Sequence, residues 1–220
     1  MTSTVLAAGW SATGAVVATA LLVLLVLPRL PEPADGDDKP LYRDLATPAF
    51  AIGCAVLAGV AAAGAWLTGP PNIQPLWWVL SVFGVLLAVI DARTTWLPLP
   101  LTYAGWLAMA AAAFVVWALA GGSTVARAAG GAALAGLLFF LVWFISRGGI
   151  GFGDVRFAPL VGAAAASQSW SLLIWALLLG SLAGAAHGLV RLALRRVGPF
   201  PYAPTMLVGA YLAGGATWAG

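Results

Sequence analysis

The chain is poor in charge and in cysteine, and each shortage excludes a class of protein. Of its 220 residues, 62% are hydrophobic and only 8% are charged, whereas a soluble domain carries about 25% charged residues. A water-soluble fold could not bury so much apolar surface, so the composition indicates a membrane protein. The single cysteine, Cys54, cannot form an internal disulfide, and no Cys/His set has metal-ligand spacing. The sequence therefore predicts no metal site.

Acidic side chains are scarce outside one short stretch. The two that stand apart, Asp91 and Asp154, each lie at the edge of a long apolar run. A carboxylate at membrane depth is costly, so it marks a candidate functional site. The pair predicts chemistry that uses two carboxylates. The other five acidic residues crowd into residues 32–44: Glu32, Asp35, Asp37, Asp38 and Asp44.

The apolar runs are long and continuous, which favours helices over the alternating pattern of a barrel. Roughly 20 apolar residues cross the hydrocarbon core, and proline and glycine separate one run from the next. We expect an all-α, polytopic transmembrane helical bundle of about eight spans. The first run lacks a basic flank and is too long for a cleavable signal peptide, so we expect a retained helix. The predicted spans are 5–27, 48–68, 76–92, 99–120, 129–146, 154–168, 169–190 and 203–218.

The basic residues predict the orientation of the bundle. With the N-terminus outside, only Arg127 falls on the outer side, which satisfies the positive-inside rule. Asp91 and Asp154 are then both expected at cytoplasmic helix ends, and the acidic loop 28–47 is cytoplasmic. The basic residues on the inner side would be Arg29, Lys39, Arg43, Arg93, Arg147, Arg156, Arg191, Arg195 and Arg196.

The seventh predicted span carries small residues at helical spacing. Gly180, Gly184 and Gly188 recur at every fourth position, and such a stripe predicts close helix packing, either within the protomer or between protomers. His187 lies on the same span, and we expect it to be a hydrogen-bonded interior residue rather than a catalytic one.

Each candidate carboxylate has a structural alternative. Asp154 follows a stretch with four glycines in six residues, which begins at Gly148. Glycine lets a backbone take positive φ and approach a ligand closely. Asp154 is then expected to open a helix, where a carboxylate gains from free N–H groups and the helix dipole. It could equally be a simple N-cap. Asp91 could form a surface salt bridge to Arg93 or Arg147.

The pair is more informative than either member. Two carboxylates that meet in a partly desolvated site cannot both ionise easily, so they share a proton. The ionised partner can take a proton from water while the protonated one polarises a carbonyl, which hydrolyses a peptide without a covalent intermediate. A transporter or channel that uses Asp91 and Asp154 as ion or proton sites is the alternative. Inverted repeats would favour it, and none is evident.

Three sequence motifs carry a family resemblance. Gly151-Phe-Gly-Asp154 is a GxGD motif, which extends from Gly149 to Phe157 with Arg156 where Lys is usual. Asp91 is followed by Leu97-Pro98 and Leu101-Thr102, and a late segment runs from Pro201 to Gly209. On these motifs, residues 76–210 resemble the prepilin peptidases (type IV leader peptidases), which are GxGD-type membrane aspartic proteases.

The resemblance implies a single integral membrane peptidase domain over residues 1–220, with Asp91 and Asp154 as the catalytic dyad. It implies cleavage, at the cytoplasmic face of the inner (plasma) membrane, of prepilin-like or pseudopilin precursors. These have a basic leader, a glycine and then an apolar helix. Membrane lipid is the other expected partner; nucleic acid and cofactors are not expected. Residues that would shape the substrate loop are Gly149, Gly151, Gly153, Arg156 and Pro98.

The chain also departs from the family pattern. Leu99 stands where many members have Asp. Many members carry a large insert with paired zinc-binding cysteines after the first helix, whereas the loop 28–47 is short and lacks cysteine. This argues against zinc and against N-methylation of the product. Presenilin-like proteases place Tyr before the first Asp, where this chain has Ile90. A non-catalytic component of a pilus or secretion machine is a further alternative.

Overall fold

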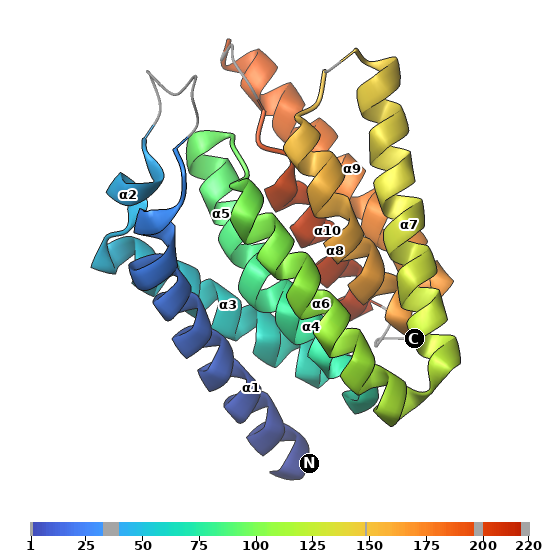
Figure 1. Ribbon diagram of the computed structural model, residues 1–220. Coiled ribbons are helices and arrows are strands. Elements are labelled where there is room, and N and C mark those ends of the chain that lie inside the picture. Colours follow the sequence, from blue (N-terminus) through green and yellow to red (C-terminus); the bar gives the residue numbers. More distant parts are fainter. Residues whose placement is uncertain (1, 33–39, 148, 196–199, 217–220) are drawn as a thin grey trace.

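The computed structural model is a bundle of helices that run roughly alongside one another (Figure 1). It describes residues 2–32, 40–147, 149–195 and 200–216. These residues contain helices and no strand, so the predicted all-α fold is confirmed. Parts of the predicted loops lie outside the described residues, namely Asp35, Asp37, Asp38, Lys39, Gly148, Arg196 and the Gly198-Pro199 break.

Every predicted span corresponds to helix. The first begins with α1 (Thr2–Leu21) and continues through a π turn (Leu22–Val26) and a 3-10 turn (Leu27–Arg29), and the third joins α4 to α5 through a second π turn (Leu80–Gly84). The remaining helices follow in order: α2 (Tyr42–Leu45), α3 (Pro48–Thr68), α4 (Gln74–Val79), α5 (Val85–Thr94), α6 (Leu99–Ala120), α7 (Gly122–Ile145), α8 (Phe152–Gln168), α9 (Trp170–Ala193) and α10 (Ala203–Ala216).

The chain is a multi-pass membrane protein. Within the described residues, six helical segments are long and apolar enough to cross a bilayer. The two other predicted spans are the shorter helices α8, of 17 residues, and α10, of 14 residues. Helix α7 begins at Gly122 rather than at residue 129, because Gly121 alone makes the turn, with φ of 81°.

Helix α8 lies inside the bundle, packed against α7, α9 and α10 (Figure 1). Its small residues Ala163–Ala166 are all buried. A Cβ atom at Gly131 of α7 would lie 2.5 Å from the carbonyl oxygen of Gly162 in α8. The two helices therefore cross in near backbone contact, which small residues allow in membrane bundles.

The side chain of Arg127 caps the C-terminal end of α8. Its Nε donates to the carbonyl of Ala166 at 2.8 Å, and its Nη2 donates to the carbonyl of Ser167 at 2.6 Å. The last carbonyls of a helix have no intrahelical partner and carry partial negative charge. Arg127, the one basic residue predicted on the outer side, thus supplies hydrogen-bond donors to the last carbonyls of α8.

Helix α10 packs closely on α9 through glycine. A Cβ at Gly180 would lie 3.1 Å from the Cα of Met206, and one at Gly184 would lie 2.6 Å from the Tyr202 ring. The predicted close packing is confirmed for these two residues. At Gly188 a Cβ would meet nothing within 4 Å, so this glycine makes no such contact within the described chain. His187 is exposed beside it rather than interior.

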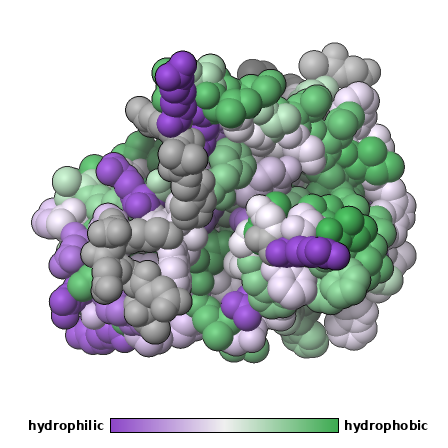
Figure 2. Space-filling model, turned by 90° about the horizontal axis from the view of Figure 1, so that it is seen from above, coloured by the Kyte–Doolittle hydropathy of each residue, from purple (hydrophilic) through white to green (hydrophobic). Residues whose placement is uncertain are grey.

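The C-terminal end of α5 and the N-terminal end of α8 lie at the same end of the bundle, at the top of Figure 1. Figure 2 views this end, where hydrophilic side chains gather among apolar ones. The termini of α5 and α8 carry Asp91 and Asp154 respectively. The prediction that both carboxylates share one end of the bundle is therefore confirmed.

Candidate active site

Asp91 and Asp154 line one cavity of about 520 Å³ at this end of the bundle. Its walls come from three stretches of chain: the turn after α5, the glycine-rich segment that enters α8, and the segment before α10. The two carboxylates are 4% and 5% exposed. The structure thus brings together both residues that the sequence singled out.

Asp91 lies in the last turns of α5 and is bound from a distant part of the chain. Its Oδ2 accepts a hydrogen bond from the backbone N–H of Ala203 at 3.2 Å. Ala203 opens α10, so its N–H is one of the first-turn donors that lack a helical partner. Ala203 was not among the predicted site residues. The available signal was Pro204, because proline near a helix start marks where free N–H groups lie.

The turn after α5 fixes the direction of the chain beyond Asp91. Thr95 adopts the left-handed conformation, with φ of 56°, and its N–H donates to the carbonyl of Asp91 at 2.7 Å. The hydroxyl of Thr94 accepts the N–H of Trp96 at 3.1 Å. Pro98 stands at the N-cap of α6, and its carbonyl accepts the Thr102 N–H at 3.0 Å. It thus ends the turn that leads from Asp91 into α6.

Asp154 occupies the first turn of α8, but not as its cap. The helix begins at Phe152 after Gly151, which stands at the N-cap position. The N-cap interpretation of Asp154 is therefore wrong. Among the described residues, Asp154 Oδ1 is buried and has no hydrogen-bond partner. A buried carboxylate oxygen is costly without a partner, so this atom marks where a water or a ligand would bind.

The glycines before Asp154 serve close approach rather than positive φ. Gly151 is extended, with φ of −66° and ψ of 140°, and Gly121 is the glycine with positive φ in the described ranges. The positive-φ expectation is thus wrong for Gly149, Gly151 and Gly153. A Cβ at Gly151 would lie 3.4 Å from Oδ2 of Asp154.

The two aspartate motifs meet at Gly153. A Cβ there would lie 3.1 Å from Cδ1 of Leu97 and 3.2 Å from its Cβ. Leu97 belongs to the turn that follows α5, so this contact holds the Asp91 segment against the start of α8. Gly149 lies further out, where its N–H donates to the Ser146 hydroxyl at 3.1 Å.

Arg156 places a positive charge at the cavity wall. Its guanidinium carbon lies 4.7 Å from the ring centre of Phe152, a cation–π arrangement. Its carbonyl accepts the indole N–H of Trp106 at 3.0 Å. The side chain is therefore held by Phe152 of its own helix, while the Trp106 bond ties the backbone of α8 to α6.

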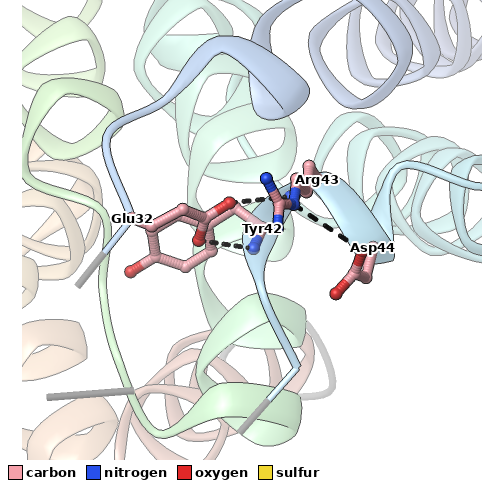
Figure 3. Close-up of polar contacts among 4 residues, drawn as sticks. All are labelled: Glu32, Tyr42, Arg43 and Asp44. Carbon is pink, nitrogen blue, oxygen red and sulfur yellow. Dashed lines mark hydrogen bonds and ion pairs between the residues drawn. The ribbon is translucent and has the colours of Figure 1, made fainter. Parts of the chain in front are cut away.

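The negative charge of Asp91 contributes to the raised pKa of Tyr42. The sequence did not predict this relationship. The Tyr42 side chain is buried, and Glu32 holds its helix by accepting the N–H groups of Tyr42 at 2.8 Å and Arg43 at 3.1 Å (Figure 3). Arg43 pairs in turn with Asp44 at 4.0 Å. Burial first, and then the negative charges of Glu32 and Asp91, raises the pKa of Tyr42 to about 12.

The described part of the chain contains no group of three His, Cys, Asp or Glu side chains that could hold a metal ion. The cavity instead offers two carboxylates, a guanidinium and backbone groups. This set can bind and polarise a water molecule and a carbonyl.

Comparison with known proteins gives one match. The model of the type IV leader peptidase family matches residues 78–189, just over half of the chain, and this stretch contains Asp91 and Asp154. No curated protein and no solved structure matches the chain.

Proposed function

The chain belongs to the type IV leader peptidase family, and on this premise we propose that it is a membrane aspartic endopeptidase. Its substrates are prepilin-like or pseudopilin precursors, from which it removes the leader. The observation that carries the proposal is the shared cavity: Asp91 and Asp154, far apart in sequence, both line it and are both nearly buried.

The proposed reaction uses the two carboxylates on one water. The ionised carboxylate takes a proton as the water oxygen attacks the scissile carbonyl carbon, and the protonated carboxylate donates to the carbonyl oxygen. The C–N bond then breaks. The carboxyl that took the proton of the water gives it to the leaving amine, and a hydroxyl of the tetrahedral intermediate returns a proton to the other carboxylate as the C=O bond re-forms. The unpartnered Oδ1 of Asp154 supports this role, because an oxygen without a protein partner is free to hold the water.

Backbone groups help to position the substrate in this proposal. Gly151 and Gly153 lack side chains where Oδ2 of Asp154 and Leu97 approach. The space at Gly153 is taken by Leu97, whereas Gly151, at the cavity wall, leaves room for an extended substrate backbone beside Asp154. Arg156, at the cavity wall, is suited to contact a substrate carbonyl or carboxylate.

The orientation is part of the proposal. Basic side chains accompany the cavity end of the bundle, including Arg29 after α1, Arg93 in α5 and Arg191 in α9. This end is therefore cytoplasmic by the positive-inside rule. The basic leader of the precursor stays on that side, so leader and dyad meet there.

A cleavage assay tests the dyad. Pilin-like precursors are co-expressed with the wild type, Asp91→Asn or Asp154→Asn, and leader removal is followed by gel shift. We expect the wild type to cleave and both variants to be inactive, because neither amide can replace a carboxylate in proton transfer. Asp44→Asn is the matched control, since this exposed carboxylate should be dispensable. Cleavage by both dyad variants would contradict the aspartic mechanism and favour an ion-binding role.

A further inference from the structure

An apolar groove opens towards the membrane between α3, α5 and α10. Its volume is about 590 Å³. The floor is buried, with Val85 4% and Ala88 3% exposed, whereas Val60 and Leu212 on the walls are 67% and 55% exposed. The groove is thus open sideways, and a helix could enter it from the bilayer without crossing the protein.

The groove begins beside the candidate active site. Ala92 and Pro204 line its inner end. They are the chain neighbours of Asp91 and Ala203, which are hydrogen-bonded to each other. From Pro204 the groove follows α10 to Leu212, about 12 Å at the rise of an α-helix. It therefore leads from the depth of Asp91 towards the opposite side of the bundle.

We propose that this groove binds the apolar transmembrane helix of the precursor, immediately beyond the cleavage point. The proposal rests on the proposed function and names the docking site of its substrate. Ala61, Gly64, Ala88 and Ala92 line the groove. In membranes, helices associate by close packing on such small residues. A helix seated there would present the peptide bond at its cytoplasmic end to Asp91.

A second groove of similar size provides a comparison. It lies between α6, α7 and α8, has a volume of about 580 Å³ and is equally apolar. Its first α8 residue is Pro159, five positions beyond Asp154, which is about 7.5 Å along a helix. At the end nearer the dyad, Trp106 is hydrogen-bonded to the carbonyl of Arg156. This groove is set back from the carboxylates and should not receive the substrate.

Glycines of α3 allow a matched pair of variants. A Cβ at Gly64 or at Gly53 would meet nothing within 4 Å, so both positions tolerate a larger side chain. Gly64 lines the α3–α5–α10 groove, whereas Gly53 does not. Gly64→Phe therefore fills the groove, and Gly53→Phe controls for the substitution itself. Ala129→Phe fills the second groove.

The kinetic test compares two substrates that differ only in the helix. One is a precursor that the wild type cleaves, and the other is the same precursor truncated five residues after the cleavage point. Gly64→Phe should raise KM for the full precursor about tenfold, equivalent to about 1.4 kcal/mol of binding, and leave the truncated one unaffected. Gly53→Phe and Ala129→Phe should match the wild type. Wild-type kinetics for Gly64→Phe would overturn the proposal, and a raised KM for Ala129→Phe alone would move the site to the second groove.

Disulfide cross-linking tests the groove without requiring cleavage. The enzyme carries Asp154→Asn and Cys54→Ala, with one new cysteine at Val208, Leu212 or Ala129. The probe is a designed precursor with a Lys/Arg-rich leader, a glycine and one cysteine in an apolar helix of about 20 residues. Cross-links from Val208→Cys and Leu212→Cys, but not from Ala129→Cys, support the proposal. If Val208→Cys and Leu212→Cys form no cross-link, the proposal is wrong and lipid fills the groove. This result stands even if the wild type cleaves no precursor, an outcome that would contradict only the peptidase assignment.

Discussion

The backbone N–H of Ala203 donates a hydrogen bond of 3.2 Å to the Oδ2 of Asp91, across 112 positions of sequence. The bond joins the start of α10 to the end of α5. Because a free N–H at a helix start also carries the positive end of the helix dipole, α10 both orients this carboxylate and stabilises charge on it. The late proline-containing segment thus contributes to the site through its backbone.

Removing this donor should impair catalysis more than folding. In Ala203→Pro the N–H is lost at the first position of α10, where proline is compatible with a helix. We expect cleavage to fall about ten- to a hundredfold, because a hydrogen bond to a charged group contributes about 1.5–3 kcal/mol. The assay is precursor cleavage, with thermal unfolding in detergent to verify the fold. Ala203→Gly keeps the N–H and should remain active; equal activity of both variants would show that the bond is dispensable.

Packing of α10 on α9 can be tested by adding one methyl group. A Cβ at Gly209 would clash with the backbone of Ala176 and Gly180, whereas one at Gly188 meets nothing. Both Gly→Ala changes gain helix propensity of about 1 kcal/mol. We expect Gly209→Ala to lower the unfolding temperature, because overpacking costs about 1–3 kcal/mol or more against backbone. Gly188→Ala should be neutral or stabilising, and similar behaviour of the two would contradict the close crossing.

Arg127 should stabilise the bundle through α8. Arg127→Met keeps most of the apolar stem but removes both donors to the carbonyls of Ala166 and Ser167. We expect a loss of about 1–3 kcal/mol, the cost of leaving buried acceptors unpaired, measured as a lower unfolding temperature in detergent. Arg127→Lys retains the charge near the helix end and should recover part of the loss. If Met and Lys variants both match the wild type, the cap has no role.

The raised pKa of Tyr42 predicts a loss of stability at alkaline pH. Its pKa rises from 10.0 to about 12 in the folded protein, so the folded state retains a proton that the unfolded state releases. The stability it contributes is complete below pH 10 and is lost as the pH rises towards 12. Tyr42→Phe cannot ionise, and its unfolding temperature should fall less over this interval. Near-ultraviolet titration should show one late phenolate fewer in the variant. Parallel curves for the two proteins would contradict the burial of the phenol beside Glu32 and Asp91.

The bundle and the end at which Asp91 and Asp154 lie could be predicted because their signals are local. Continuous apolar runs predict helices, and loop charges predict sides of the membrane. Helix boundaries could be predicted where proline or glycine interrupts an apolar run. Helix α3 begins at Pro48 and ends at Thr68, as predicted. The start of helix α7 was predicted too late in the sequence, because the single glycine at position 121 is sufficient for the turn.

Contacts between distant segments could not be predicted in the same way. The donor on Ala203 is a backbone group that every residue but proline possesses. Pro204 indicates a helix start there, but nothing in the sequence shows that this start lies against Asp91. The proximity of Tyr42 to Asp91 likewise depends on how α2 folds back on the bundle. Glycine periodicity predicted a stripe on α9, but only the partner helix decides that Gly180 is packed and Gly188 is not.

The hydrogen bonds from Tyr42 and Arg43 to the Glu32 carboxylate have a consequence for the length of the chain between them. They hold residue 32 against residues 42 and 43, so both ends of the intervening segment are fixed. Each doubling of the length between fixed ends costs only about 0.6 kcal/mol of closure free energy. An accessory domain could therefore be spliced between residues 32 and 42 with little effect on the helices. The segment between these two anchors can therefore change in length without a change in the packing of the helices.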